Sequence, residues 1–277
     1  KPDVTLLASP TNLVCGDTVF FNVQLNGGMP AVCGPSVSNA CVAPSSQYII
    51  GTPMGANTAT NYPAPFGNWY RNAKHQFLYT AAELNAMGIT GGKITEIAWQ
   101  VSQINGTVNY NDYSVKMGCT SQSALTNVWV SGLTTVFTPQ NILINIGWNN
   151  LTFTTAYEWD GLSNIVVEIC YNNLATNFTQ NSITPFTITA FNSSTFYFSD
   201  ATLACPIMTM NAGSPSPNRP ITRFGFCTTL PDPLNYSFQW TPSSSIDDAT
   251  AQTTFALPQL GLPTTVVADG PAGLRIE

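Results

Sequence analysis

Alternating and continuous apolar runs predict β-strands along most of the chain. The segment 147–171 shows both patterns: polar and apolar residues alternate over 150–154 (Asn-Leu-Thr-Phe-Thr), and a nearly continuous apolar run covers 165–170. Alternation is typical of a half-buried strand, and a continuous run is typical of a fully buried one. We therefore expect two strands here, the second deeply buried, joined as a hairpin by the turn residues Glu158-Trp159-Asp160-Gly161.

The same patterns predict many more short strands and one short helix. The predicted strands cover 3–8, 18–25, 74–79, 92–101, 113–117, 133–137, 194–199, 220–226, 234–241, 252–257 and 264–268. The helix follows Tyr79, because Thr80 and Glu83 form a capping-box pattern and Gly88 supplies a stop. Many short strands with a single helix indicate an all-β fold, a jelly-roll-like β-sandwich.

The two ends of the chain share a pattern that differs from the middle. A strand begins after Cys15-Gly16-Asp17, and a late strand ends in Trp240-Thr241-Pro242. These two sequence motifs resemble the opening and closing halves of the PKD and immunoglobulin-like repeats of Bacteroidetes surface proteins. The resemblance implies that residues 1–41 and 228–277 form one split immunoglobulin/PKD-like sandwich. Residues 42–227 are then an inserted jelly-roll-like β-sandwich, since insertions at loop tips are tolerated.

The middle region carries a second resemblance. It is similar to an extracellular module of large Bacteroidetes surface proteins that the type IX pathway exports, including gliding-motility-type adhesins. The matching words are Tyr-Pro-Ala-Pro-Phe-Gly-Asn-Trp-Tyr (62–70), Lys-His-Gln (74–76), Ala-Ala-Glu-Leu (81–84), Lys-Met-Gly-Cys-Thr (116–120), Gly-Leu-Thr-Thr-Val-Phe-Thr-Pro (132–139), Trp-Asp-Gly (159–161) with Ser-Asn (163–164), and Asn-Arg-Pro (218–220). This resemblance implies a cell-surface adhesive role and brings no catalytic residues.

Sparse charge narrows the classes of partner. Charged residues make up 8% of the 277 residues, against about 25% in ordinary globular proteins, while hydrophobic residues reach 44% and the net charge is -6. High hydrophobicity with a small net charge predicts a folded chain. The eight Lys and Arg are scattered and the pI is about 4.5, so we expect no nucleic-acid partner. No apolar segment reaches the roughly 20 residues that span a bilayer, so we expect no membrane insertion.

Cysteine usage points to an oxidising, extracellular location. The chain has seven cysteines, Asn- and Thr-rich loops and no zinc-type CxxC spacing. An odd number leaves one cysteine without an internal partner, which we expect to be Cys15. The other six are predicted to form disulfides, with these alternatives left open: Cys227 with Cys41 or Cys33, and Cys170 with Cys205 or Cys119.

Titratable residues give little support to catalysis. His75 is the only histidine, and neither a G-x-S-x-G elbow nor cysteines at zinc-ligand spacing accompany it. We predict a hydrogen-bonded structural histidine. Glu83 is used as a helix cap and Asp160 by a turn, which leaves few carboxylates for the facing pair of a glycosidase. We therefore predict that the protein is not an enzyme, and Glu168 is the carboxylate at which a hydrolase hypothesis would be tested.

Two kinds of binding site are considered. We expect no cofactor. Calcium is the one ion considered, because it prefers oxygen ligands, which Asp112, Asp160 or Asp200 could supply. The D-x-[DN]-x-[DN]-G loop of many calcium sites is absent. Aromatic rings beside Asn and Asp suit carbohydrates. The candidate rings are Trp69, Tyr70, Trp129, Trp148 and Trp159, while Trp99, Trp159 and Trp240 are assigned to the core. Trp69 and Tyr70, in a Gly- and Asn-rich loop, are the predicted ligand-contact pair.

Together these patterns favour a non-enzymatic, secreted or cell-surface module that builds an adhesin or an extracellular filament. Its expected partners are copies of itself or neighbouring domains of a longer surface protein, which strand addition at open sheet edges would join. Glycans are the second class of partner. The alternative function is a carbohydrate-binding module assisted by calcium.

Overall fold

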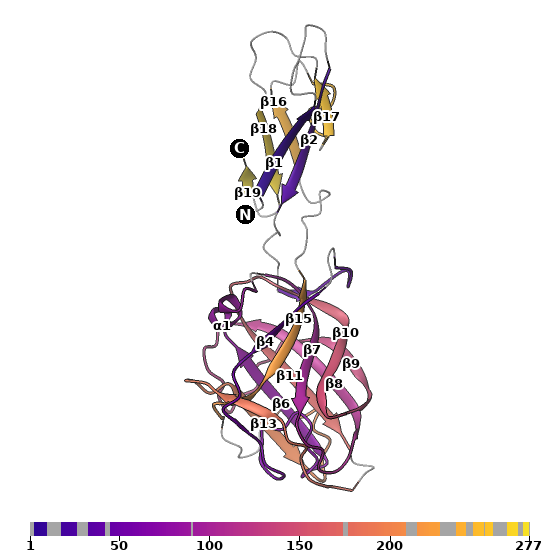
Figure 1. Ribbon diagram of the computed structural model, residues 1–277, viewed down its shortest axis with the longest axis vertical. Coiled ribbons are helices and arrows are strands. Elements are labelled where there is room, and N and C mark those ends of the chain that lie inside the picture. The colour runs from indigo at the N-terminus through magenta and orange to yellow at the C-terminus, as the bar shows by residue number, and fades with distance from the viewer. Residues whose placement is uncertain are drawn as a thin grey trace. The chain divides into compact units, whose positions relative to one another are not determined.

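The chain divides into two compact units. The computed structural model describes residues 3–9, 18–26, 33–41, 45–89, 91–173, 177–208, 215–227, 237–241, 246–251, 253–256, 265–270 and 274–276. Lys1–Met29 and Thr229–Glu277 form one unit, the terminal unit, and Pro30–Thr228 form the other, the central unit (Figure 1).

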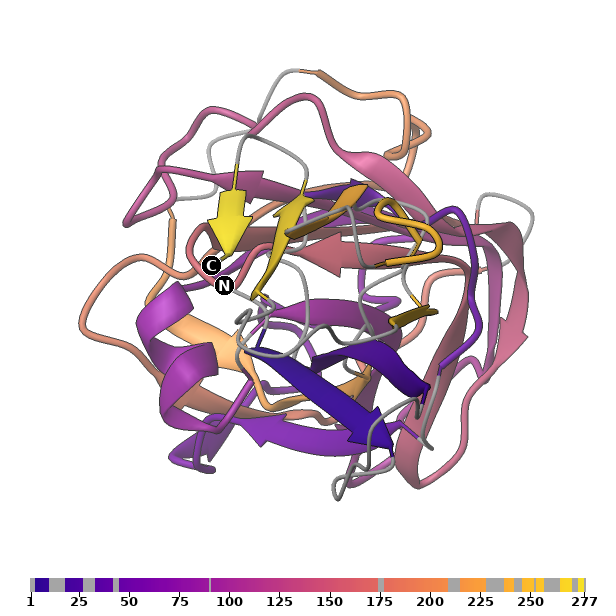
Figure 2. The same ribbon diagram turned by 90° about the horizontal axis from the view of Figure 1, so that it is seen from above.

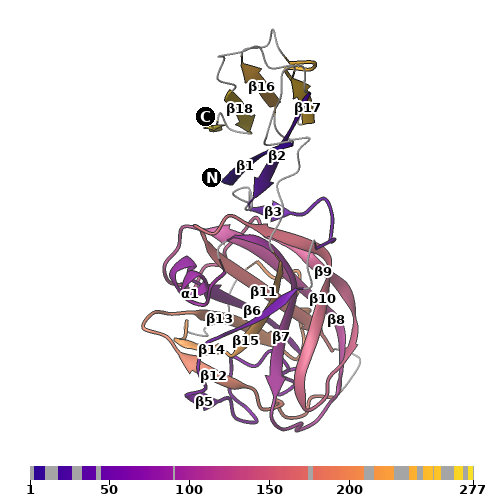
Figure 3. The same cartoon turned by 45° about the horizontal axis from the view of Figure 1, so that its top comes forward.

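Two five-stranded antiparallel sheets build the central unit (Figure 1). The first sheet has the order β3 (Gly34–Pro35), β10 (Gly147–Trp159), β7 (Gly92–Val101), β15 (Thr222–Cys227) and β4 (Ser46–Ile50). The second has the order β13 (Ser194–Ser199), β6 (Asn72–Tyr79), β11 (Asn164–Asn172), β8 (Asn109–Thr120) and β9 (Thr134–Leu143). A small third sheet contains β14 (Asn218–Pro220), β12 (Pro185–Ile188) and β5 (Gly55–Ala56) (Figure 3).

The strand order is that of a jelly roll. The eight principal strands are, along the chain, β4, β6, β7, β8, β9, β10, β11 and β15. If these eight strands are numbered 1 to 8 along the chain, and β3 and β13 are left out, the strand order of the first sheet is 1-8-3-6 and that of the second is 2-7-4-5. This is the arrangement of two Greek keys wrapped into a double sheet. The predicted all-β, jelly-roll-like fold class is confirmed, and β4, β12 and the two-residue strands were not predicted.

The predicted hairpin at 147–171 is wrong, although both of its strands exist. β10 pairs with β7 and β3, whereas β11 pairs with β6 and β8 in the other sheet. Every residue of β11 from Ile165 to Tyr171 is buried. This is because β11 lies between two other strands and both faces of its sheet are covered. The connection therefore crosses from one sheet to the other, with the fully buried Trp159 filling the space at the crossing.

Aromatic rings fill much of the core between the two sheets. Trp99 and Trp159 are fully buried there, as predicted. The ring of Phe66 lies 5.8 Å from those of Tyr110 and Tyr113, measured between ring centroids. A second, smaller cluster of Leu78, Val166 and Leu125 lies on the other face of the second sheet. Residues 121–133 thus cover that face, which is why β11 is buried from Ile165 to Tyr171.

The predicted helix is α1 (Ala81–Ala86), the one α-helix among the described residues. Thr80 Oγ1 accepts a hydrogen bond from Glu83 N at 3.2 Å, and Glu83 Oε2 accepts one from Thr80 N at 2.9 Å, which completes the capping box. Gly88 follows the helix with φ of 88°, a conformation that favours glycine. α1 lies at the periphery of the central unit in two perpendicular views (Figures 1 and 2).

In the terminal unit the two ends of the chain share a sheet. β2 (Val19–Asn26) pairs with β1 (Asp3–Ser9) on one side and with β17 (Thr253–Ala256) on the other. A second sheet contains β16 (Ser237–Thr241), β18 (Thr265–Gly270) and β19 (Leu274–Ile276). Trp240 of β16 is fully buried, and its ring lies 5.4 Å from that of Phe21 in β2. The contact between these rings joins the two sheets.

The boundary between the units falls earlier than residue 42. Pro30–Cys41 belongs to the central unit, because β3 pairs with β10 and because disulfides join Cys33 to Cys119 and Cys41 to Cys227. This segment contains two Pro, a Gly and two Ser, as linkers often do, but two disulfides and the pairing of β3 fasten it to the central unit. At the other end the central unit closes at Thr228.

Candidate functional site

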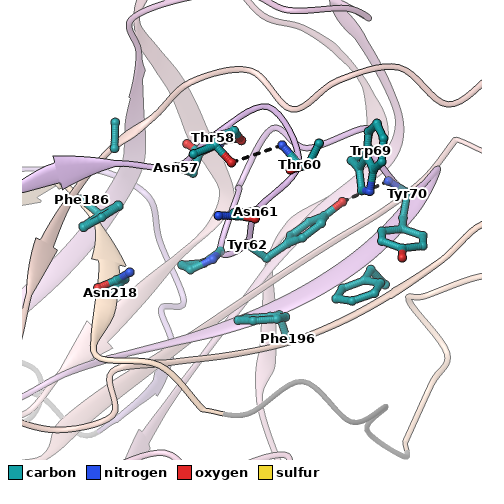
Figure 4. Close-up of a pocket in the computed structure, with 13 residues that line it drawn as sticks. Asn57, Thr58, Thr60, Asn61, Tyr62, Trp69, Tyr70, Phe186, Phe196 and Asn218 are labelled. Carbon is teal, nitrogen blue, oxygen red and sulfur yellow. Dashed lines mark hydrogen bonds between the residues drawn. The ribbon is translucent and has the colours of Figure 1, made fainter.

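Trp69 and Tyr70 line a pocket of about 400 Å³ in the central unit (Figure 4). The pocket lies between the loop that joins β5 to β6 and the strands β12, β13 and β14. Its lining contains aromatic rings, amides and hydroxyls and no charged side chain: Ala56, Asn57, Thr58, Thr60, Asn61, Tyr62, Pro63, Trp69, Tyr70, Phe186, Phe196, Phe198 and Asn218.

A stack of aromatic rings fixes one wall of this pocket, hereafter the aromatic pocket. The ring of Phe198 lies 5.0 Å from Tyr62 and 4.2 Å from Tyr70, and Phe196 lies 5.9 Å from Tyr62. The Tyr62 hydroxyl accepts a hydrogen bond from Tyr70 N at 3.2 Å. Burial raises the pKa of Tyr62, so its hydroxyl stays neutral. The wall is therefore rigid and uncharged.

Asn181 holds the loop that carries Trp69. Its Oδ1 accepts hydrogen bonds from the backbone N of Asn68 and of Trp69, both at 2.9 Å, and its Nδ2 donates to the carbonyl of Asn61 at 2.9 Å. The side chain is fully buried. A Cβ at Gly67 would approach Asn181 Oδ1 to 2.7 Å, so a side chain there would displace the amide. Sequence reasoning missed Asn181, because one Asn in an Asn-rich chain carries no positional signal.

Several polar side chains that line the aromatic pocket have no partner within the described part of the chain. These are the amides of Asn61 and Asn218 and the hydroxyl of Thr60, whereas Asn57 is satisfied by the backbone of Thr58, Ser182 and Thr184. Figure 4 shows Asn61 and Asn218 at the pocket beside the rings of Tyr62 and Phe186. Unpaired amides and hydroxyls beside aromatic faces match a ligand that has both hydroxyl groups and apolar C–H faces.

The five candidate rings do not form one platform. Trp69 and Tyr70 lie together in the aromatic pocket, and the ring of Trp69 packs edge-on to Phe178 at 6.2 Å. Trp159 is in the core, as expected. Trp129 is 8% exposed and lies under the ammonium group of Lys74, 4.7 Å from Nζ to the ring centroid. Trp148 lines a different hollow.

His75 is a structural histidine, as predicted. It is fully buried, and its Nε2 accepts a hydrogen bond from Ala64 N at 3.2 Å. Burial lowers the pKa of His75 to about 3. The imidazole is therefore neutral at physiological pH, packed against the rings of Tyr62 and Phe77.

Because of His75, we expect the free energy of unfolding of the central unit to depend on pH between about 7.5 and 5, which is above the range in which most carboxylates titrate. Its pKa is about 3 in the folded protein, against 6.5 for an exposed histidine. Below pH 6.5 the unfolded state therefore binds a proton that the folded state does not, at about 1.4 kcal/mol per pH unit. We expect the free energy of unfolding to fall by about 2 kcal/mol between pH 7.5 and 5.

Guanidinium unfolding at pH 7.5, 6 and 5 would measure this dependence, with His75→Gln as the matched variant. Gln retains a hydrogen-bond acceptor for Ala64 N and does not titrate, and His75 is the only histidine of the chain. The variant should lose the slope. If the free energy of unfolding had the same pH dependence in both proteins, His75 would not be a histidine that is buried in its neutral form.

Asp112, Asp160 and Asp200, the alternative calcium ligands, lie in different surroundings. Asp160 Oδ1 accepts hydrogen bonds from Leu162 N and Ser163 N, and its Oδ2 accepts one from Ser163 Oγ at 2.6 Å, the turn role expected of it. Asp200 Oδ1 accepts from Arg71 N at 3.0 Å. Asp112 has φ of 52° on β8. Among the described residues, the one group of metal-ligating types is Cys33, Cys119 and Asp160, and its two sulfur atoms are joined as a disulfide.

Glu168 is engaged in a buried ion network. Lys74 Nζ lies 3.3 Å from its Oε2, Lys116 Nζ lies 3.3 Å from its Oε1, and Gln76 Nε2 donates to Oε2 at 2.8 Å. Gln76 also exchanges two hydrogen bonds with the backbone of Val130. Burial lowers the pKa of Lys74, which the charge of Glu168 partly offsets. The network fastens residues 121–133 to the second sheet and is separate from the aromatic pocket.

All six cysteines predicted to be bridged are bridged. Cys41–Cys227 and Cys170–Cys205 are each one of the alternatives left open, while Cys33–Cys119 is a pairing that we did not expect. Cys33 lies beside β3, and β3 pairs with the end of β10, which spacing along the chain could not reveal. Cys15 lies outside the described residues. Three disulfides indicate an oxidising, extracellular environment.

Comparison of the chain with protein-family models, with curated proteins and with solved structures gave no match. Within the described residues, no helix has both the length and the apolar character needed to cross a membrane.

Proposed function

We propose that this protein is a non-enzymatic, extracellular adhesive module of a bacterial cell surface and that its aromatic pocket binds a neutral saccharide. The observation that carries the proposal is the lining of that pocket. Aromatic faces stand beside the Asn61 and Asn218 amides, which have no partner among the described residues, and none of the described lining residues is charged. A sugar presents apolar C–H faces to such rings and hydroxyl groups to such amides.

The absence of charge from the lining also supports a binding role over a hydrolytic one. Glycoside hydrolysis needs two carboxyl groups on either side of the scissile bond. No carboxylate is among the residues that line the aromatic pocket, and Glu168 is held by two lysines elsewhere. The same lining supports binding without calcium, so a chelator should leave saccharide binding unchanged.

Three disulfides, sparse charge and the resemblance to exported surface modules support the extracellular, adhesive part of the proposal. The terminal unit supports assembly with other copies. β1 pairs only with β2 and β19 only with β18 among the described strands, so each has an edge that can accept another strand. Electron micrographs of the purified protein test this: filaments or paired particles are expected, and isolated particles at high concentration would contradict assembly.

Trp69→Ala is expected to weaken saccharide binding about 10- to 30-fold, because buried aromatic anchors contribute roughly 1.4–2 kcal/mol or more. The measurement is a calorimetric titration with neutral tri- and hexasaccharides of glucose, xylose and mannose, which gives the dissociation constant of each. Trp69→Phe should retain most of the affinity, because it keeps an aromatic face.

Leu162→Ala is the matched control, because Leu162 is 81% exposed and lines neither hollow described here. It should bind like the unchanged protein. The proposal fails if no neutral saccharide binds, or if Trp69→Ala binds as many equivalents, as tightly, as Leu162→Ala.

A further inference from the structure

A second hollow, of about 420 Å³, lies between β9 and β10 and has a lining similar in kind to the aromatic pocket. Its lining also lacks charge and consists of Phe137, Ile142, Leu143, Asn145, Trp148, Asn149, Asn150 and Leu151. Figure 3 shows β9 and β10 on one side of the central unit, and β5, β12 and β14 on the other. The two hollows share no lining residue.

One face of the Trp148 ring is held by Arg223. The guanidinium carbon of Arg223 lies 4.6 Å from the ring centroid, and Arg223 Nη2 donates a hydrogen bond to Asn150 Oδ1 at 2.6 Å. Arg223 is not among the residues that line the hollow, whereas Trp148 is. The ring is therefore fixed from the side of β15 and presents its remaining surface to the hollow.

Apolar and amide groups surround that surface. Leu143 is 68% exposed, although it is a large aliphatic side chain, and it lines the hollow beside Trp148. The Asn145 side chain has no hydrogen bond to another described residue, and the Asn150 Nδ2 group is likewise uncommitted, since only its Oδ1 is used. Asn149 is satisfied differently: it bonds the backbone of Asn145 and Gly147 and fixes the turn.

We propose that this hollow, hereafter the Trp148 site, is a second binding site for a neutral saccharide. Trp148 and Leu143 offer apolar surface to the C–H face of a pyranose ring. The Asn145 amide and the Asn150 Nδ2 group, which have no partner among the described residues, bind its hydroxyls. No lining residue is charged, and the neighbouring guanidinium of Arg223 is already bound to Asn150 Oδ1 and the Trp148 ring, so the hollow suits a neutral sugar. The Trp148 site uses different residues from the aromatic pocket, so each site can fail without the other.

Two sites on different sides of one unit would make the module bivalent. A polysaccharide or a glycan-coated surface could engage both, and the second contact would then form at a high effective concentration. Apparent affinity for a long polymer should therefore exceed the affinity for a trisaccharide by at least tenfold. This gain should disappear when either site is removed.

The test is titration with trisaccharides of glucose, xylose and mannose, read by NMR of the tryptophan indole N–H signals and by calorimetric stoichiometry. The chain has six tryptophans: Trp69, Trp99, Trp129, Trp148, Trp159 and Trp240. The signals of Trp69 and Trp148 should move on titration, and those of the buried Trp99, Trp159 and Trp240 should stay in place. The unchanged protein should bind two equivalents.

Trp148→Ala and Trp69→Ala should each bind one equivalent, and the double variant should bind none. Trp148→Phe should keep two equivalents, and Leu162→Ala serves again as the control. Unfolding midpoints close to that of the unchanged protein show that each variant is folded. If Trp148→Ala is not folded, the movement of the Trp148 indole signal in the unchanged protein provides the test.

The outcomes separate the two proposals. If the protein binds one equivalent, lost only in Trp69→Ala, the Trp148 site is refuted and the proposed function stands. If binding is lost only in Trp148→Ala, the Trp148 site stands and the aromatic pocket is refuted. If Trp148→Ala keeps two equivalents, or if no signal moves with any trisaccharide, the Trp148 site is refuted.

Discussion

Glu83→Gln is expected to destabilise the central unit by about 2–3 kcal/mol, less than the cost of about 3–5 kcal/mol for a fully buried ion pair, because the Glu83 side chain is 29% exposed. Arg219 of β14 is fully buried, and its two terminal nitrogens lie 3.1 and 2.7 Å from the two carboxylate oxygens of Glu83. The guanidinium group also packs 4.4 Å over the ring of Tyr79 and donates to the carbonyl of Leu78. A neutral amide at position 83 leaves that charge buried without a counterion.

Burial of Glu83 disfavours its charged form, but the hydrogen bond and the charge of Arg219 outweigh this and lower its pKa. The ion pair therefore contributes its full stability above the pKa of an unfolded Glu, and the contribution is lost as the pH falls through the lowered folded value. Guanidinium unfolding at pH 7 measures the effect of the substitution, and acid unfolding measures its pH dependence.

Two further variants make the interpretation specific. Glu96→Gln is the matched control: Glu96 accepts hydrogen bonds from Gln47 and Thr152 at a partly exposed position, so we expect a change below about 0.5 kcal/mol. The double variant Glu83→Gln, Arg219→Met removes both charges and should recover a large part of the loss. If Glu83→Gln lowered the free energy of unfolding by less than about 1 kcal/mol, the Glu83 carboxylate would not be needed to compensate the buried charge of Arg219.

Removing the Cys41–Cys227 disulfide by paired substitution with Ala is expected to cost about 4–5 kcal/mol. The two cysteines are 186 residues apart in the chain and lie near the two ends of the central unit. A cross-link that closes a longer loop removes more conformational entropy from the unfolded state, which is the main source of its effect.

The Cys170–Cys205 disulfide is the internal comparison, because it spans only 35 residues. The same reasoning gives a cost about 1.5 kcal/mol smaller for its removal. Equilibrium unfolding of the two double-Ala variants measures both costs. A larger loss for Cys170–Cys205 than for Cys41–Cys227 would show that local packing, and not loop closure, dominates.

Patterns with a short range along the chain were predictable from the sequence. The strand at Gly92–Val101 and the helix with its Thr80–Glu83 capping box needed only periodicity and local hydrogen bonding. β4 was missed because Ser46–Ile50 follows a polar passage and has only one buried residue. Trp69 and Tyr70 were predicted as a ligand-contact pair because aromatic residues in a Gly- and Asn-rich loop are uncommon in a core, and both line a pocket.

The sequence by itself determined the all-β class, the single described helix, the burial of Trp99, Trp159 and Trp240, and the six bridged cysteines. Only the tertiary structure decided that β10 and β11 belong to opposite sheets, that Cys33 pairs with Cys119, and that Arg219 lies against Glu83. Periodicity reports whether a residue is buried, since that depends on its immediate neighbours in the strand. Which distant strand covers it is set by the packing of the whole sandwich, and the aromatic pocket and the Trp148 site both arise at that level.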